Sequence, residues 1–338
     1  GVVAEPGRGE LDAAYMAEAL ALARSVRART SPNPWVGCVV VPEGEGPVAE
    51  GATEPPGGPH AEAVALELAG AAARGATVYV TLEPCAHHGR TPPCVDALVA
   101  AGVARVVVAV EDPDQRVRGR GIVALRAAGI EVEVGTGARE ATRLLAPYLT
   151  QRRTGRPWVV LKLAATLDGR TAAPDGTSRW ITGPLARADA HQLRAESDAV
   201  AVGAGTARAD DPALTVRDAD GRDPLRVVIG RLPPVARMAP AVEHDGPLGD
   251  LLDDLGRREV LQLLVEGGAT VAHEFHRQGL VDQYVLYLAP ALLGGDDGRP
   301  VLSGPGAPTM ASAWRGRLDG VRRLGDDLRI DVLAPGRP

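Results

Sequence analysis

The segment between residues 60 and 94 constrains the fold of this chain more than any other. His60 precedes Glu62 by two positions, and Cys85 and Cys94 follow after an apolar run. One imidazole and two thiolates form a sufficient ligand set for a zinc ion that keeps its fourth position open for water. The fold must therefore bring His60, Cys85 and Cys94 together, although a helix and a strand are expected between them.

The local sequence predicts how this happens. Residues 61–73 are rich in Ala, Leu and Glu after a Gly-Gly-Pro entry, so His60 and Glu62 are expected to open a helix. Residues 77–81 are typical of a buried strand, and residues 93–101 of a second helix with proline in its first turn. Both thiols then lie beyond the strand, near a helix N-terminus, where the helix dipole favours the thiolate.

Glu62 is close to the metal in sequence without being needed as a ligand. Zinc lowers the pKa of bound water from about 15.7 to roughly 7, which supplies a nucleophile for an amino-bearing ring carbon. Ammonia is a poor leaving group, so a proton must be carried to it, and we interpret Glu62 as that shuttle. The ordinary alternatives are buried structural thiols and a histidine that only caps a helix. The combination of the three ligands with Glu62 favours a zinc deaminase instead. His87 and His88 compete as ligands, but we interpret them as substrate-loop residues.

Composition narrows the class of protein. The 338 residues predict two domains, each able to bury a core. A formal charge of −6 and 3% aromatic residues speak against the basic channel and stacking platforms of a nucleic-acid enzyme. Nothing approaches the roughly 20 apolar residues of a membrane span. With two of three cysteines assigned to metal, Cys38 is expected to be a buried thiol, and a reducing, cytoplasmic location is predicted.

Alternating strands and helices predict a layered α/β fold in both halves. In the first half, residues 1–9 are expected to be a disordered leader, and 151–157 a domain boundary. Helices are predicted at residues 10–29, 122–128 and 138–149, and strands at 36–41, 48–51, 104–110 and 130–134. In the second half, residues 158–170 are predicted to hold an apolar strand that ends in a polar turn. Further strands are predicted at residues 199–202, 225–229, 260–265 and 283–288, and helices at 184–196 and 270–278.

One residue of the second half stands out. Lys162 is the only lysine among 37 basic residues, and it lies on an apolar strand that ends in a polar turn. A chain so biased towards arginine is expected to keep lysine where a compact ammonium is required, although a leftover lysine is the simpler alternative. There is no Gly-x-Gly-x-x-Gly after a strand, which speaks against a Rossmann dinucleotide site. Two glycines at 267–268, between a strand and a helix, offer another anion site.

Two segments of the first half resemble a known family. Zinc deaminases often space their cysteines as Cys-x-x-Cys, but here eight residues intervene. The segment from Pro84 to Cys94 resembles Pro-Cys-x-His-x-Gly-Arg-Thr-Pro-Pro-Cys of the deaminase of riboflavin biosynthesis, and residues 31–39 resemble its Asn-Pro-x-Val-Gly segment. The resemblance implies a cytidine-deaminase-like α/β/α domain over residues 10–150. It also implies substrate contacts from Asn33, His87 and Arg90, and residues 111–121 are expected to border the pyrimidine or its phosphate or to form a plain loop.

The second half resembles the reductase of the same bifunctional family, which implies a dihydrofolate-reductase-like α/β domain over residues 157–335 that uses NADPH. The match is poor between residues 231 and 259. The resemblance gives Lys162 the task of neutralising charge during hydride delivery. Cofactor contacts are implied for Ala164, Trp180, Thr206, Asp210, Gly268, Ala269 and Thr270. Substrate contacts are implied for Ser178, Arg194, Leu214, Arg217 and Glu266, with a surface ion pair as the alternative for Arg194.

The predicted function is a bifunctional enzyme of riboflavin biosynthesis with zinc and NADPH as cofactors. It deaminates 2,5-diamino-6-(5-phosphoribosylamino)pyrimidin-4-one and then reduces the ribosyl chain to ribityl. The expected partners are this small phosphorylated pyrimidine and further copies of the chain, without nucleic acid or membrane. The alternatives are a nucleic-acid base deaminase with an appended binding module, a specialised paralogue acting on a related pyrimidine, and a non-catalytic zinc scaffold.

Overall fold

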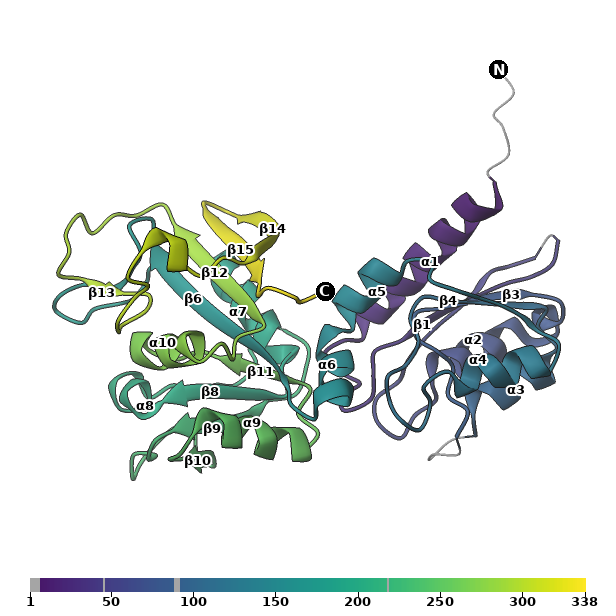
Figure 1. The fold of residues 1–338 in the computed structure, drawn as a ribbon, viewed down its shortest axis with the longest axis horizontal. Helices are drawn as coiled ribbons and strands as arrows, with labels where there is room; N and C mark the ends of the chain where they lie inside the picture. Colours follow the sequence, from purple (N-terminus) through teal and green to yellow (C-terminus); the bar gives the residue numbers. More distant parts are fainter. Residues whose placement is uncertain (1–6, 45, 88–91, 218) are drawn as a thin grey trace, which may run out of the picture. The chain divides into compact units, whose positions relative to one another are not determined.

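The structure is a computed structural model, and it describes residues 7–44, 46–87, 92–217 and 219–338. The chain divides into two compact units, residues 1–154 and 155–338 (Figure 1). Among the described residues, no helix is both long enough and apolar enough to cross a membrane.

The N-terminal unit contains one mixed five-stranded sheet in the order β2-β1-β3-β4-β5. Strand β1 runs antiparallel to β2 and β3, whereas β3, β4 and β5 are parallel. The strands are β1 (Gly37–Val41), β2 (Ala49–Ala52), β3 (Thr77–Val80), β4 (Arg105–Val108) and β5 (Glu131–Val134). The helices are α1 (Arg8–Ser25), α2 (Ala61–Ala69), α3 (Cys94–Ala101), α4 (Arg120–Ala127), α5 (Ala138–Leu144) and α6 (Ala146–Thr154), with a 3₁₀ turn at Gly70–Ala73.

Helices cover both faces of this sheet, which gives the expected α/β/α layers. Helices α1 and α5 lie on one face, and α2, α3 and α4 lie on the other (Figure 1). Two glycines allow the closest approaches. A Cβ on Gly37 would lie 1.9 Å from the carbonyl oxygen of Ala19 in α1, and one on Gly51 would lie 2.3 Å from that of Ala61 in α2. Helices and strands thus pack against each other's backbone on both faces.

The C-terminal unit is built on an eight-stranded sheet in the order β10-β9-β8-β11-β6-β12-β15-β14, in which β15 and β14 are antiparallel to their neighbours and the rest are parallel. The strands are β6 (Trp158–Thr166), β8 (Ala199–Gly203), β9 (Leu225–Ile229), β10 (Val242–His244), β11 (Gln262–Val265), β12 (Gln283–Ala289), β14 (Arg317–Leu324) and β15 (Asp327–Leu333). A separate ribbon pairs β7 (Arg170–Ala172) with β13 (Arg299–Pro300), and a 3₁₀ turn lies at Met310–Ser312.

Helices α9 (Leu248–Arg257) and α10 (Ala269–Arg277) share one apolar core with strands β6, β8, β9 and β11. Helix α7 (Pro184–Ala195) buries Ala186, Leu193 and Ala195 and makes polar contacts with the sheet as well. Its Asp189 accepts hydrogen bonds from Tyr287 of β12 at 2.7 Å and from Arg329 of β15 at 2.8 Å. The short helix α8 (Ala204–Asp210) follows β8 directly.

Four expectations about the elements need correction. The first helix begins at Arg8, inside the expected leader, and ends at Ser25 rather than Arg29; residues 1–6 lie outside the described part of the chain. The helix expected over 138–149 is two helices, and α6 continues to Thr154 through the expected break. The poorly matching segment 231–259 holds β10 and α9. The C-terminal hairpin β14–β15 was not foreseen, because its exposed arginines obscure the alternation that marks a strand.

Candidate functional site

Three side chains of the N-terminal unit converge as the sequence predicts. The ligand atoms of His60, Cys85 and Cys94 all lie within 4.8 Å of one another. His60 Nδ1 is 3.3 Å from Cys94 Sγ and 3.6 Å from Cys85 Sγ. A tetrahedral zinc ion with bonds of about 2.1 to 2.3 Å separates its ligand atoms by roughly 3.6 to 3.8 Å. The residues present therefore fit a zinc ion with three protein ligands.

Helix ends and one strand end position these ligands. His60 is the N-cap of α2 and Cys94 is the first residue of α3, while Cys85 follows β3. The backbone N–H of Cys94 donates a hydrogen bond to Cys85 Sγ at 3.3 Å, so the N-terminus of α3 stabilises negative charge on that sulfur. Hydrogen bonds from Cys94 and His60 lower the pKa of the Cys85 thiol. The neighbouring Cys85 sulfur and burial raise the pKa of Cys94.

Glu62 lies in the first turn of α2 and is only 4% exposed. Burial raises the pKa of its carboxyl to about 7, which suits a group that must both accept and donate a proton near neutral pH. The carboxyl faces the metal centre, since both Cys85 and Cys94 act on its pKa. Cys38 of β1 is fully buried, and burial raises the pKa of its thiol, as expected for an inert cysteine.

Three further residues of this unit, Asn33, His87 and Arg90, are predicted to contact the substrate. His87 is not part of the three-residue group, and its Nδ1 is buried without a hydrogen-bond partner in the described structure. Asn33 lies in the turn before β1, where its N–H donates to the Thr30 carbonyl at 2.9 Å. Arg90 and His88 lie outside the described residues. The substrate roles of Asn33, His87 and Arg90 stay predictions.

Sequence reasoning missed Glu83, which is 4% exposed and two residues before Cys85. Its carboxylate accepts four backbone hydrogen bonds at 2.9 to 3.2 Å, from Asp112, Gly119, Gly121 and Ile122. The loop between β4 and α4 is therefore fixed to the metal-ligating segment. A glutamate at the buried end of a strand, directly before a proline and a metal ligand, is the signal that could have revealed it.

In the C-terminal unit, Glu266 joins the two basic residues that the sequence singles out. Arg194 donates two hydrogen bonds to the Glu266 carboxylate, at 2.8 and 2.9 Å, and Lys162 Nζ lies 3.9 Å from it. Burial alone would raise the pKa of Glu266, but the charges of Lys162 and Arg194 outweigh burial and lower it. Arg194 is thus in an ion pair, as the alternative held, but the pair is largely buried at the end of the central strands.

The residues predicted to hold the cofactor gather where β8 and β11 end. Gly203 is the N-cap of α8 and Gly268 the N-cap of α10, and these strands are parallel neighbours. A Cβ on Gly268 would lie 3.1 Å from Thr206 Oγ1. The two turns therefore adjoin, and N–H groups at adjacent helix N-termini form a suitable place for an anion such as a pyrophosphate.

The other predicted reductase residues come from several separate segments of the C-terminal unit. Ala164 lies on β6, and Asp210 is the exposed last residue of α8. Trp180 is 70% exposed, and the guanidinium of Arg187 lies 4.4 Å from the centre of its ring. The remaining predicted residues differ in burial. Leu214 and Ala269 are buried, Ser178 is half-buried, and Arg217 and Thr270 are exposed. No contact with a cofactor or substrate tests their roles.

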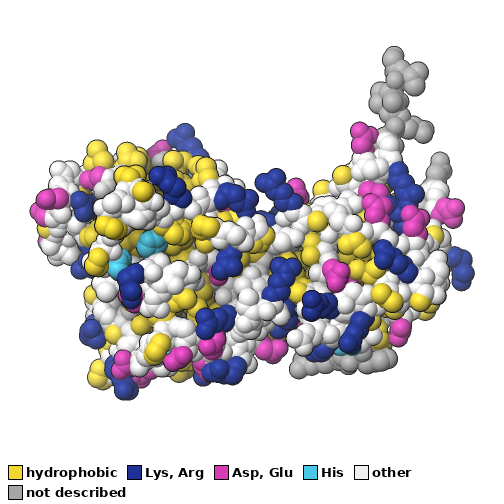
Figure 2. Space-filling model, in the orientation of Figure 1, with side chains coloured by type: hydrophobic (Ala, Val, Ile, Leu, Met, Phe, Trp, Pro, Cys, Tyr) yellow, Lys and Arg dark blue, Asp and Glu magenta, His cyan; other side chains and the backbone are white. Residues whose placement is uncertain are grey.

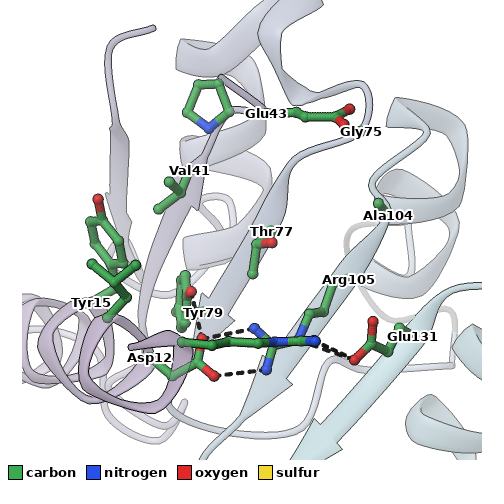
Figure 3. A pocket seen from close by; sticks show the side chains of 13 residues that line it. Asp12, Tyr15, Val41, Glu43, Gly75, Thr77, Tyr79, Ala104, Arg105 and Glu131 are labelled. Atoms are coloured by element: carbon green, nitrogen blue, oxygen red, sulfur yellow. Dashed lines mark hydrogen bonds and ion pairs between the residues drawn. The ribbon is translucent and has the colours of Figure 1, made fainter. Parts of the chain in front are cut away.

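A separate cavity of about 580 Å³ lies at the opposite end of the N-terminal sheet, where β3, β4 and β5 begin (Figure 3). Arg105 donates to both carboxylate oxygens of Asp12, at 2.7 and 2.8 Å, and Tyr79 donates to Asp12 at 2.8 Å. Figure 3 shows Arg105 between Asp12 and Glu131. Both arginines of this lining, Arg8 and Arg105, are paired with carboxylates of the protein, so we interpret this cluster as structural.

Comparison with known proteins assigns a family to each of the two units. Residues 10–110 match the cytidine and deoxycytidylate deaminase zinc-binding region, and residues 157–330 match the RibD C-terminal domain. The chain is 43% identical to the riboflavin biosynthesis protein RibD of Escherichia coli over 365 residues, covering 95% of this chain and 99% of that protein. For the RibD of Mycobacterium tuberculosis H37Rv, the identity is 44% over 325 residues, covering 91% and 93%.

Solved structures give the same result. Acinetobacter baumannii RibD, form 1, superposes with a TM-score of 0.90 at 40% identity, covering 96% of this chain and 99% of that one. The Thermotoga maritima diaminohydroxyphosphoribosylaminopyrimidine deaminase/5-amino-6-(5-phosphoribosylamino)uracil reductase superposes with a TM-score of 0.89 at 34% identity, covering 97% and 100%. The chain belongs to the RibD family. As in other RibD proteins, a deaminase zinc-binding region precedes a reductase domain.

Proposed function

We propose that this chain catalyses two successive steps of riboflavin biosynthesis. The first is hydrolytic deamination of 2,5-diamino-6-(5-phosphoribosylamino)pyrimidin-4-one, and the second is NADPH-dependent reduction of its ribosyl side chain to ribityl. The observation that carries the proposal is the His60, Cys85 and Cys94 cluster beside buried Glu62, in one chain with the Lys162 and Glu266 pair. We assign deamination to residues 10–150 and reduction to residues 157–335.

In the deaminase site, His60, Cys85 and Cys94 would hold the zinc ion. When bound, zinc supplies a water molecule of lowered pKa as the nucleophile. Glu62 accepts a proton from the attacking water and passes it to the amino nitrogen on C2 of the pyrimidine. Water thus replaces ammonia, and the ring gains a carbonyl. Burial raises the pKa of the Glu62 carboxyl, which suits a group that first accepts and then donates a proton.

In the reductase site, Lys162 is the proposed residue at the reacting carbon. When bound, NADPH would supply the hydride that reduces C1 of the opened ribosyl chain, and a proton from solvent would complete the ribityl product. The ammonium of Lys162 neutralises the negative charge that develops during this transfer, and Glu266 keeps the ammonium oriented at 3.9 Å. The adjoining turns at Gly203 and Gly268 support NADPH as the cofactor, because their N–H groups suit its phosphates.

A nucleic-acid base deaminase remains the alternative of a different class. Such an enzyme needs a continuous basic channel, whereas basic and acidic side chains are interspersed on the face drawn in Figure 2. We further propose a cytoplasmic enzyme, because the two metal-binding thiols must stay reduced. Assembly into a homo-oligomer and the absence of nucleic-acid partners stay predictions.

The direct test gives the purified protein the diamino-pyrimidine ribose phosphate and measures ammonia release without cofactor, then NADPH oxidation by absorbance. We expect ammonia first, followed by NADPH loss that depends on the deaminated product. Ammonia without NADPH loss would overturn the assignment of the second domain. The absence of both reactions would favour the paralogue that acts on a related pyrimidine.

A further inference from the structure

A short segment of the C-terminal unit, residues 214–217, has an unusual backbone conformation. Leu214 is only 3% exposed, and its φ of 53° lies in the left-handed region, which a leucine adopts only where its surroundings hold it there. The same segment ends at Arg217, and both residues are implied as substrate contacts. The surroundings that hold the segment therefore matter to the reductase site.

Helix α7 supplies two of the hydrogen bonds that fix this segment. Arg194 Nη1 donates to the Thr215 carbonyl at 2.8 Å, and the N–H of Arg217 donates to His191 Nδ1 at 3.4 Å. His191 and Arg194 are three positions apart on the helix, so their side chains lie on the same face. The face of α7 that pairs with Glu266 thus also carries His191.

The half-buried imidazole of His191 belongs to the polar cluster around Glu266. Burial raises the pKa of the Glu266 carboxyl, and nearby cationic groups, His191 among them, lower it. Lys162 Nζ lies 3.9 Å from the same carboxylate. His191 is therefore a neighbour of the proposed reductase residues, although no motif in the sequence marks it.

The hydrogen bond from Arg217 determines which nitrogen of His191 carries the proton. Because Nδ1 accepts the backbone N–H, the neutral imidazole has its proton on Nε2. A doubly protonated ring would have no acceptor left at Nδ1. The neutral imidazole is therefore the form that anchors the segment.

The side chain of Arg217 is available to a ligand. It is exposed, and among the residues that the structure describes its guanidinium has no ion-pair or hydrogen-bond partner. A long side chain loses rotamer freedom when it binds, and a fixed backbone reduces how much must be ordered at that moment. The anchor at His191 thus prepares Arg217 for binding.

We propose that His191 is a positioning residue of the reductase: by accepting the backbone N–H of Arg217, it holds that arginine where its guanidinium binds the substrate. The inference rests on the proposed function and deepens it, because it adds a residue that acts through another rather than at the reacting carbon. Arg194 cannot take over this task, since its guanidinium is already bound to Thr215 and Glu266.

The test measures reduction of the deaminated intermediate by NADPH, with KM and kcat determined separately. His191→Leu removes the acceptor. His191→Asn keeps an acceptor near the position of Nδ1, whereas His191→Gln places its amide near the position of Nε2. Gln192→Leu is the matched control, because Gln192 is the exposed neighbour on α7 and bonds to Glu196 one turn further on.

We expect His191→Leu to raise KM for the deaminated intermediate by roughly 10-fold with kcat little changed, because Arg217 must then be ordered on binding. His191→Asn should restore most of this loss, and His191→Gln should not. Gln192→Leu should match the wild type. KM for NADPH and the rate of ammonia release should stay at wild-type values in every variant, which shows that each is folded.

A double-mutant cycle shows whether His191 acts through Arg217. We expect Arg217→Gln to raise KM at least as much as His191→Leu does. Adding His191→Leu to Arg217→Gln should then change KM no further. Additive effects would overturn the inference, because His191 would act independently of the arginine.

Two further results would overturn the inference while leaving the proposed function intact. An unchanged KM in His191→Leu would mean that the segment does not need this anchor. Rescue by glutamine but not by asparagine would mean that His191 contacts the substrate directly through Nε2. If the wild type does not reduce the deaminated intermediate, the proposed function fails and the inference fails with it.

Discussion

In the N-terminal unit, the metal ligands come from one segment, residues 60–94, and the elements between them are local neighbours in the sequence. In the C-terminal unit, Lys162, Arg194 and Glu266 come from β6, from the end of α7 and from the turn after β11. The first site can be recognised from residue types and their spacing. The second exists only once a parallel sheet has aligned its strand ends, because it lacks a spacing pattern along the chain.

The two sites also differ in how charge is balanced. Glu62 is buried beside thiols that need a metal ion to complete the site, so burial raises its pKa to about 7. Glu266 has two cations of the protein within reach, and they lower its pKa despite burial. A proton shuttle benefits from the first environment, whereas a fixed anion that orients an ammonium benefits from the second.

The largest expected effect comes from Glu62→Gln, which keeps the shape of the side chain but removes its basicity. We expect deamination to fall by roughly 10² to 10⁴-fold, the range for losing a general acid–base group. Zinc content, measured on the purified protein, and reduction of the deaminated intermediate should stay at wild-type levels. Full deaminase activity in this variant would remove Glu62 from the proposed role.

In the C-terminal unit, the matching change is Lys162→Arg, which keeps the charge but replaces the compact ammonium with a planar fork. We expect reductase kcat to fall by roughly 10 to 100-fold, because the donor no longer sits where charge develops. Ammonia release measured in the same preparation should be unaffected, which controls for folding. A wild-type reductase rate would refute the inference from the single lysine.

The Asp12 and Arg105 cluster provides a structural contrast to both sites. Asp12→Ala leaves the buried Arg105 guanidinium short of its bidentate partner, and we expect the N-terminal unit to lose about 3 kcal/mol of stability. Arg8→Ala removes a mostly exposed ion pair with Glu131 and should cost less than about 1 kcal/mol. Hydrogen exchange of peptides from the N-terminal unit would measure the loss of stability in each variant. Equal losses for Asp12→Ala and Arg8→Ala would contradict the difference in burial between the two ion pairs.

The smallest effects are the pH responses of two buried carboxylates, Asp112 and Glu266. Burial raises the pKa of Asp112 to about 6 from the ordinary 3.8, so its stabilising contribution is present below 3.8 and is lost as pH rises through 6. The pKa of Glu266 is lowered, so its contribution is present above the ordinary 4.5 and is lost as pH falls.

Two neutral variants separate these responses. Asp112→Asn should flatten the dependence of stability on pH between about 4 and 6 in the N-terminal unit. Glu266→Gln should flatten the dependence of stability on pH below about 4.5 in the C-terminal unit. Hydrogen exchange resolved by peptide would follow each unit separately. Identical pH profiles for the two units would contradict the opposite environments of these carboxylates.

The comparison explains what the sequence could predict. The His60, Cys85 and Cys94 group, its helix ends and the α/β class follow from residue types and short-range patterns. The ion pair between Arg194 and Glu266 does not, because it joins residues 72 positions apart across the sheet. The four backbone hydrogen bonds to Glu83 could not be predicted for the same reason, since they depend on how the loop after β4 packs in the folded unit.

The most direct test of two separate sites in one chain uses the Glu62→Gln variant with NADPH and the diamino substrate. Our account predicts very slow ammonia release and equally slow NADPH oxidation until the deaminated intermediate is added, after which NADPH is oxidised at the wild-type rate. NADPH oxidation faster than ammonia release before that addition would show that reduction does not require prior deamination and would contradict the proposed order. Continued silence after the addition would contradict the independence of the two sites.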